Sequence, residues 1–95
     1  PAFPGGKKDL MRYLKGTVSY PESAKKSGVE GTVHLQFIVT KEGEIKEPEV
    51  IKGVNEALNE EALRVVRNMP DWEPGKQRGE PVNVRYKLPI RFALN

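Results

Sequence analysis

The sequence predicts an α+β fold, with a three-stranded antiparallel sheet that carries helices on one face. Residues 82–94 place an apolar side chain at every even position, and residues 32–40 alternate in nearly the same way. Such alternation is typical of a β-strand with one buried face, because successive side chains point to opposite sides. Residues 58–69 instead repeat their apolar side chains at helical spacing. With 95 residues, we expect one domain over residues 1–95.

The N-terminal stretch predicts a short helix. A turn at Phe3–Gly6 comes first, and Leu10, Tyr13 and Leu14 then fall at i, i+3 and i+4, the spacing of one helix face. Gly16 is expected to end this helix.

The next stretch predicts a helical turn and then a β-hairpin. Tyr20-Pro21 opens the helical turn, since proline suits a first helical position, and Gly28 closes it. Gly31 leads into the first strand, which is expected over residues 32–40, and Lys41–Glu44 is expected to form a hairpin turn. The return strand, Ile45–Ile51, loses its alternation part-way, which predicts a bulge.

The strongest helix signal lies between the hairpin and the last strand. Asn59 is the expected N-cap, and Pro70 should stop the helix. Trp72 follows in a proline-rich turn, where it is either a ligand-binding aromatic or, as we favour, a cap on the core. Gln77–Glu80 reads as a polar loop. The helix has one apolar stripe, formed by Leu58, Ala62, Val65, Val66 and Met69.

Two prolines predict the order of the strands. Proline has no N–H for a β-ladder and therefore lies at sheet edges or bulges. Pro48 falls in the second strand and Pro89 in the third, whereas the first strand has none. The first strand should therefore be central, in the spatial order second, first, third.

Pro89 also predicts which side of the last strand is open. Backbone N–H groups alternate between the two sides of a strand, so Asn83, Arg85 and Lys87 share the side of Pro89. That side cannot be fully paired at Pro89, and we expect it to face solvent. An open edge either receives an extended peptide or is merely protected by charge, and the residues alone leave both readings open.

Signs of catalysis or metal binding are absent from the sequence. There is no Cys, and the single His34 lies on the polar side of a strand without a matched acid or nucleophile. We therefore expect no enzyme, no cofactor and no metal. The net charge of +3 leaves nucleic-acid binding through Arg85, Lys87 and Arg91 as a weaker hypothesis, because no aromatics are interleaved with them.

Several spaced motifs resemble the C-terminal domain of energy transducer TonB proteins, and they cover essentially the whole chain. The motifs are Phe3-Pro4-Gly5-Gly6, Tyr13-Leu14, Tyr20-Pro21-x-x-Ala24, the span Gly28 to Gly31, the strand Thr32 to Val39, Gly43-x-Ile45, Glu61-Ala62-Leu63, Met69-Pro70-x-Trp72-x-Pro74-Gly75 and Leu88-Pro89-Ile90.

The resemblance implies a periplasmic domain excised from a longer protein anchored in the inner membrane. Such a domain works with a proton-driven partner complex, through the missing N-terminal region, and transmits energy to outer-membrane transporters for nutrient uptake such as siderophore uptake. It binds the TonB box of the transporter as an added strand along its last strand. The partner-binding residues implied in this chain are Val82, Asn83, Val84, Arg85, Tyr86, Lys87 and Leu88, with Thr17 and Ser19 of a nearby loop.

Two features keep alternatives open. The best-known TonB proteins carry a Gln just before Tyr-Pro, whereas this chain has Gly16–Ser19 there. Similar domains also occur on other membrane proteins, such as antirepressor-like sensors. A structural or sensory domain, or a homodimer formed through the last strand, is therefore the alternative to a transducer.

Overall fold

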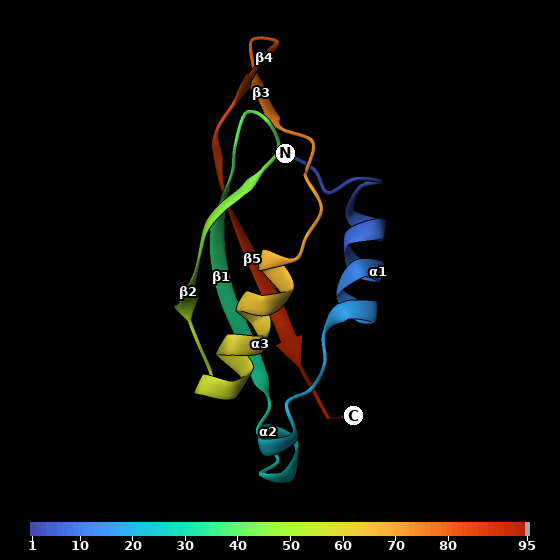
Figure 1. The fold of residues 1–95 in the computed structure, drawn as a ribbon, viewed down its shortest axis with the longest axis vertical. Coiled ribbons are helices and arrows are strands. Elements are labelled where there is room, and N and C mark those ends of the chain that lie inside the picture. The colour runs from blue at the N-terminus through green and yellow to red at the C-terminus, as the bar shows by residue number, and fades with distance from the viewer. Residues whose placement is uncertain (95) are drawn as a thin grey trace.

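A computed structural model describes residues 1–94 and contains a three-stranded antiparallel sheet in the order β2-β1-β5 (Figure 1). The helices are α1 (Lys7–Thr17), α2 (Glu22–Lys26) and α3 (Glu56–Arg67). The strands are β1 (Gly31–Val39), β2 (Ile45–Lys52), β3 (Gly75–Gln77), β4 (Glu80–Val82) and β5 (Val84–Phe92). The α+β fold and the central position of the first strand are as the sequence predicts.

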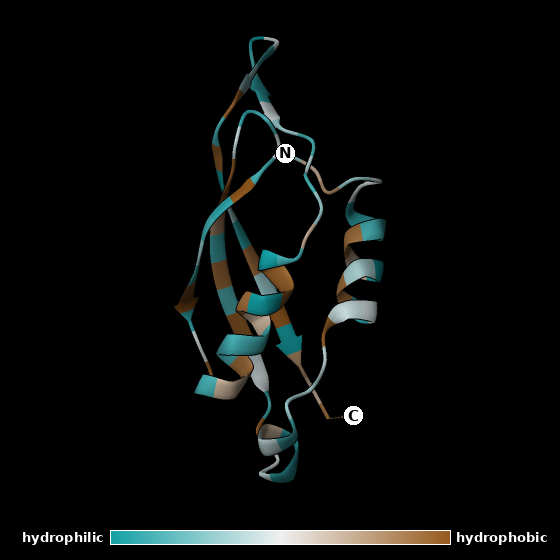
Figure 2. Cartoon of the chain, in the orientation of Figure 1, coloured by the Kyte–Doolittle hydropathy of each residue, from teal (hydrophilic) through white to brown (hydrophobic). Residues whose placement is uncertain are grey.

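The pairing of β1 with β5 is the most regular part of the sheet. It runs without interruption from Gly31 opposite Phe92 to Val39 opposite Val84. Apolar and polar residues alternate along both strands, as Figure 2 shows. This alternation fixes the register, because a shift by one residue would turn every buried side chain outward.

Helices α1 and α3 lie over the same face of the sheet, with α1 toward the side of β5 (Figure 1). The core between the layers contains Phe3, Leu10, Ala24, Val33, Leu35, Phe37, Val39, Leu58, Ala62, Val65, Val66, Trp72, Leu88, Ile90 and Phe92. Among residues 1–94, no helix has the length and apolar character needed to cross a membrane.

Strand β2 contains the irregularity that its sequence predicts. Its register against β1 shifts twice, between His34 and Leu35 and between Gln36 and Ile38. Glu47 takes a positive φ of 50° just before Pro48. A bulge here accommodates the proline, which cannot donate to the ladder.

The N-cap of α3 differs from the residue that the sequence predicts. Asn59 was the expected cap, but the helix begins at Glu56 and the side chain of Asn55 accepts a hydrogen bond from the Leu58 N–H at 2.9 Å. Asn59 lies within the helix, and its side-chain oxygen accepts the Val54 N–H at 3.0 Å. Both asparagines therefore serve the same turn, and the sequence pattern did not distinguish their roles.

A second correction concerns the residues before the last strand. Gln77–Glu80 was expected to be a polar loop, but β3 and β4 pair there as a small hairpin that extends one end of the molecule (Figure 1). Arg78 and Gly79 form its tip with φ of 54° and 80°, the backbone that a two-residue hairpin turn requires. Val82 consequently belongs to β4, and the last strand begins at Val84.

Trp72 packs in the core, as expected. It is 3% exposed and lies against the rings of Phe3, Phe37 and Tyr86, with centroid separations of 5.8, 5.4 and 4.9 Å. Its backbone N–H donates to the Gly43 carbonyl at 2.7 Å. The Trp72 ring therefore joins the N-terminal segment, β1 and β5, and its backbone is tied to the β1–β2 turn.

Candidate functional site

Strand β5 is an edge of the sheet, with β1 on one side and no other strand of the described residues on the other. Its odd-numbered residues Arg85, Lys87, Pro89 and Arg91 are exposed, whereas Leu88 and its even-numbered neighbours turn toward the core. The strand thus presents a charged outer face and an unshared edge.

The register identifies the backbone groups on that edge. Antiparallel pairs alternate between hydrogen-bonded and non-hydrogen-bonded, and Pro89 opposite His34 has no N–H to share. Arg85, Lys87 and Arg91 have the same parity as Pro89, so their N–H and C=O groups point away from β1. Beyond the strand ladder, no hydrogen bond among the described residues reaches these groups.

The residues proposed for partner binding do not all lie in this strand. Val84–Leu88 form the first half of β5, whereas Val82 ends β4 and Asn83 lies between the two strands. The Asn83 side-chain oxygen accepts a hydrogen bond from the Lys41 N–H at 2.8 Å. Asn83 therefore ties the start of β5 to the β1–β2 turn.

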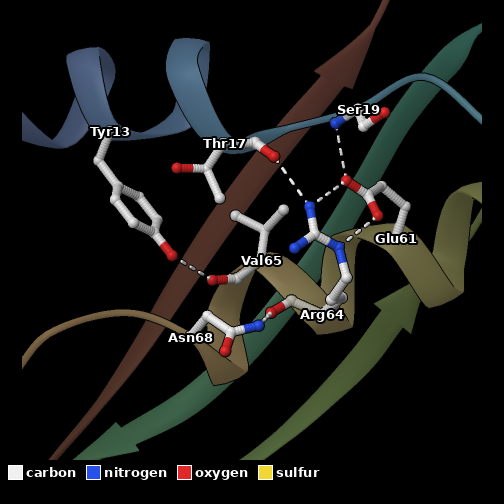
Figure 3. Close-up of polar contacts among 7 residues, drawn as sticks. All are labelled: Tyr13, Thr17, Ser19, Glu61, Arg64, Val65 and Asn68. Atoms are coloured by element: carbon white, nitrogen blue, oxygen red, sulfur yellow. Dashed lines mark hydrogen bonds and ion pairs between the residues drawn. The ribbon is translucent and has the colours of Figure 1, made fainter.

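Thr17 and Ser19 lie where α1 leads into α2, and their backbone is held by α3 (Figure 3). The Ser19 N–H donates to the Glu61 carboxylate at 2.7 Å. The Arg64 guanidinium donates to the Thr17 carbonyl at 2.8 Å. The same guanidinium donates to both carboxylate oxygens of Glu61, at 2.7 and 2.8 Å.

These contacts control the ionisation of Glu61. Hydrogen bonds from Arg64 hold the pKa of Glu61 below its usual range, and the Ser19 N–H adds to this effect. Nearby, the Tyr13 hydroxyl donates to the Val65 carbonyl at 2.8 Å, and burial raises the pKa of Tyr13. The polar network thus fastens the end of α1 to α3 and leaves the carboxylate ionised.

A groove of about 1130 Å³ runs between α1 and the edge of β5. Its apolar lining comes from Leu10, Met11, Leu14, Val18, Tyr20, Tyr86, Leu88, Pro89, Ile90, Phe92 and Ala93. Its basic lining comes from Lys7, Lys8, Arg12, Lys15 and Arg91. No Asp or Glu is among the lining residues.

The sequence does not reveal this groove, although it contains one signal for the helical wall. Lys7, Met11, Leu14, Lys15 and Val18 follow one another at i, i+4, i+7, i+8 and i+11, which places them along one stripe. The stripe lies beside the buried face of α1, but only the tertiary structure places it opposite β5.

The sequence signature of the family described as Gram-negative bacterial TonB protein C-terminal matches residues 17–94. The chain belongs to this TonB C-terminal family. The match begins at Thr17, the last residue of α1.

Two curated relatives are TonB proteins. The chain is 36% identical to protein TonB of Vibrio cholerae over 76 residues, which cover 79% of this chain and 31% of the relative. It is 25% identical to protein TonB of Helicobacter pylori over 96 residues, which cover 96% of this chain and 32% of the relative. The chain therefore spans about a third of the length of these TonB proteins.

Solved structures of TonB C-terminal domains share the fold. An NMR solution structure of the Helicobacter pylori domain superimposes with a TM-score of 0.69 at 24% identity, over 90% of this chain and 78% of that chain. The Pseudomonas aeruginosa domain gives a TM-score of 0.60 at 25% identity, over 80% and 77%. These likenesses support the TonB C-terminal assignment at the level of the fold.

Proposed function

We propose that this TonB C-terminal domain is a periplasmic peptide-binding module, which binds the TonB box of an outer-membrane transporter by strand addition to β5. Through its longer parent protein, it would transmit energy from the inner membrane for nutrient uptake. One observation carries the proposal: the main-chain groups of Arg85, Lys87 and Arg91 line an edge that no other described strand occupies.

Strand addition suits a module that bears force. The added strand would form a series of main-chain hydrogen bonds, whose donors and acceptors are available on β5 whatever side chains the partner carries. A pull along the strand direction loads these bonds together. Behind them, β5 is paired with β1 over its whole length, so the load passes directly into the central strand.

Titration of the isotope-labelled 95-residue chain with a TonB-box peptide tests the proposal. We expect the largest amide shifts along residues 84–88, with smaller ones in β1. Shifts confined to β2, α3 or the β3–β4 hairpin would contradict strand addition at β5.

A proline substitution tests the role of the main chain. Lys87→Pro removes an N–H that points away from β1, so the sheet should tolerate it as it tolerates Pro89. We expect it to weaken peptide binding about tenfold, through one lost hydrogen bond and the bulk of the ring at the edge. Lys87→Ala keeps the N–H and is the matched control, with binding close to that of the unaltered chain. Equal binding by the two variants would contradict the proposal.

The rival role is self-association through the same edge, in a structural or sensory domain of another membrane protein. Unpaired strand edges are templates for pairing with any extended chain, including a second copy. Sedimentation over a range of concentrations separates the two roles. Dimers that form without any response to the peptide, and that Lys87→Pro disrupts, would favour the rival.

A further inference from the structure

The groove between α1 and β5 lies on the helix-bearing side of the open edge. The side chain of Met11 on α1 is 59% exposed there, and only Ile51 on β2 is a comparably exposed large apolar residue among those described. Opposite Met11, Tyr86, Leu88 and Ile90 of β5 line the groove. An apolar helix wall thus faces the apolar side of an edge strand.

A strand added to β5 would run along this groove. Neighbouring strands lie about 4.8 Å apart, and their side chains alternate between the two faces of the sheet. Every second side chain of the added strand would therefore point to the helix-bearing face. Those side chains would meet the stripe of Met11, Leu14 and Val18 and would cover apolar surface that solvent now reaches.

The charges around the groove are all of one sign. Lys7, Lys8 and Lys15 line it from α1 and Arg91 from β5, and none of these four forms an ion pair with a described residue. The fifth cation, Arg12, pairs with Asp9 at 3.2 Å. The unpaired cations favour a ligand that brings a carboxylate to the rim of the groove.

We propose that α1 makes the edge selective, so that the groove binds an extended peptide with apolar residues at every second position and an acidic residue beside the α1 lysines. This inference rests on the strand addition proposed above. The selectivity would come from α1, most of which lies outside the family match at residues 17–94.

The requirement for alternating apolar residues can be tested with two synthetic decapeptides of alternating Val and Thr. One carries Glu at both ends, and the other carries Gln at both ends. Met11→Glu places a carboxylate in the groove, and we expect it to weaken binding of both peptides tenfold or more, through lost apolar burial and charge desolvation. Ile51→Glu on β2 is the matched control and should leave binding unchanged. Equal affinity of Met11→Glu and the unaltered chain would overturn the inference.

Reversing the charge of an α1 lysine tests the preference for an acidic residue in the peptide. We expect the Glu peptide to bind the unaltered chain about fivefold more tightly than the Gln peptide, and Lys15→Glu to remove this preference. Lys25→Glu on α2, which does not line the groove, should retain it. Loss of the preference with added salt would support the same reading.

The outcomes separate this inference from the strand addition itself. Amide shifts along β5 that are equal for both peptides and for all variants would overturn the selectivity but leave strand addition intact. Failure of both synthetic peptides to bind β5, with a TonB-box peptide still bound there, would overturn the selectivity alone, whereas failure of the TonB-box peptide as well would overturn strand addition too. Circular dichroism of each variant shows whether the helices are retained, since the substituted side chains are all exposed.

Discussion

At the scale of single residues, Glu61 connects parts of the chain that lie far apart in sequence. Its carboxylate, 10% exposed, accepts hydrogen bonds from Arg64 on the same helix and from the Ser19 backbone (Figure 3). Arg64 is itself 47% exposed and also binds the Thr17 carbonyl. A charged pair with one exposed partner avoids much of the desolvation cost of a buried pair.

This network makes part of the stability dependent on pH. Because the folded pKa of Glu61 is lowered, its contribution is complete above the unfolded pKa and is lost as pH falls through the folded value. We expect the free energy of unfolding to decrease below about pH 5, near the ordinary range of a Glu side chain. Glu61→Gln should flatten this decrease and cost about 1–2 kcal/mol at pH 7.

Urea unfolding at several pH values measures both effects. Glu60→Gln is the matched control, because Glu60 lies on the same helix, is exposed, and its side chain forms none of the hydrogen bonds found among the described residues. A Glu61→Gln variant with the same pH dependence as the unaltered chain would show that the carboxylate is not held by Arg64 in solution.

At the scale of elements, α3 depends on a cap that its sequence leaves ambiguous. Asn55 accepts the Leu58 N–H, and this places Leu58, Ala62 and Val65 on the sheet. Without the cap, the first turn would lose one of the few partners available to its free N–H groups.

Asn55→Ala should therefore lower the free energy of unfolding by about 1 kcal/mol. Asn55→Ser, which restores a hydroxyl acceptor at the cap, should recover most of this loss. Both values come from chemical denaturation. If alanine and serine destabilise the chain equally, the contribution of Asn55 does not come from capping.

Strand β5 contributes side chains to the core and also leaves main-chain groups free to bind a partner strand. Its even positions supply Leu88, Ile90 and Phe92 to the core, and its odd positions leave main-chain groups on the open edge. Pro89 is compatible with both roles because its missing N–H lies on the open side. The charges of Arg85 and Lys87 protect this edge against indiscriminate pairing.

At the scale of the whole molecule, the N-terminal segment is part of the core as well as a wall of the groove. Phe3 and Leu10 are 6% and 4% exposed, and Phe3 lies against both Tyr13 and Trp72. The segment before the family match is therefore integrated into this fold.

Deletion of residues 1–16 should destabilise the chain by about 3–6 kcal/mol, since two large buried side chains are lost. Typical domains have only 5–15 kcal/mol in total, so partial unfolding at 25 °C is an expected outcome. Urea denaturation checks this, and an unchanged midpoint would show that α1 does not pack as described. Because the deletion would unfold part of the chain, point variants of α1 test the selectivity of the groove better than removal of the helix.

Several helices and strands, and the order of the strands, could be predicted because each depends on a pattern of residues close together in the sequence. Alternation predicted β1 and β5, helical spacing predicted α3, and the placement of Pro48 and Pro89 predicted the strand order. The β3–β4 hairpin was missed because its strands are short and carry no alternation of their own. The choice of Asn55 over Asn59 escaped prediction because both residues have capping chemistry at nearly the same place.

The apolar face of each helix and strand, and the missing N–H at Pro89, can be recognised without coordinates, because both are properties of neighbouring residues on one backbone. The position of α1 along β5, the contact of Glu61 with the Ser19 backbone, and the cationic lining of the groove without a carboxylate are evident only from the folded chain. These arrangements depend on how side chains from distant segments fill a common core, and no periodicity within a segment encodes the distance between two segments.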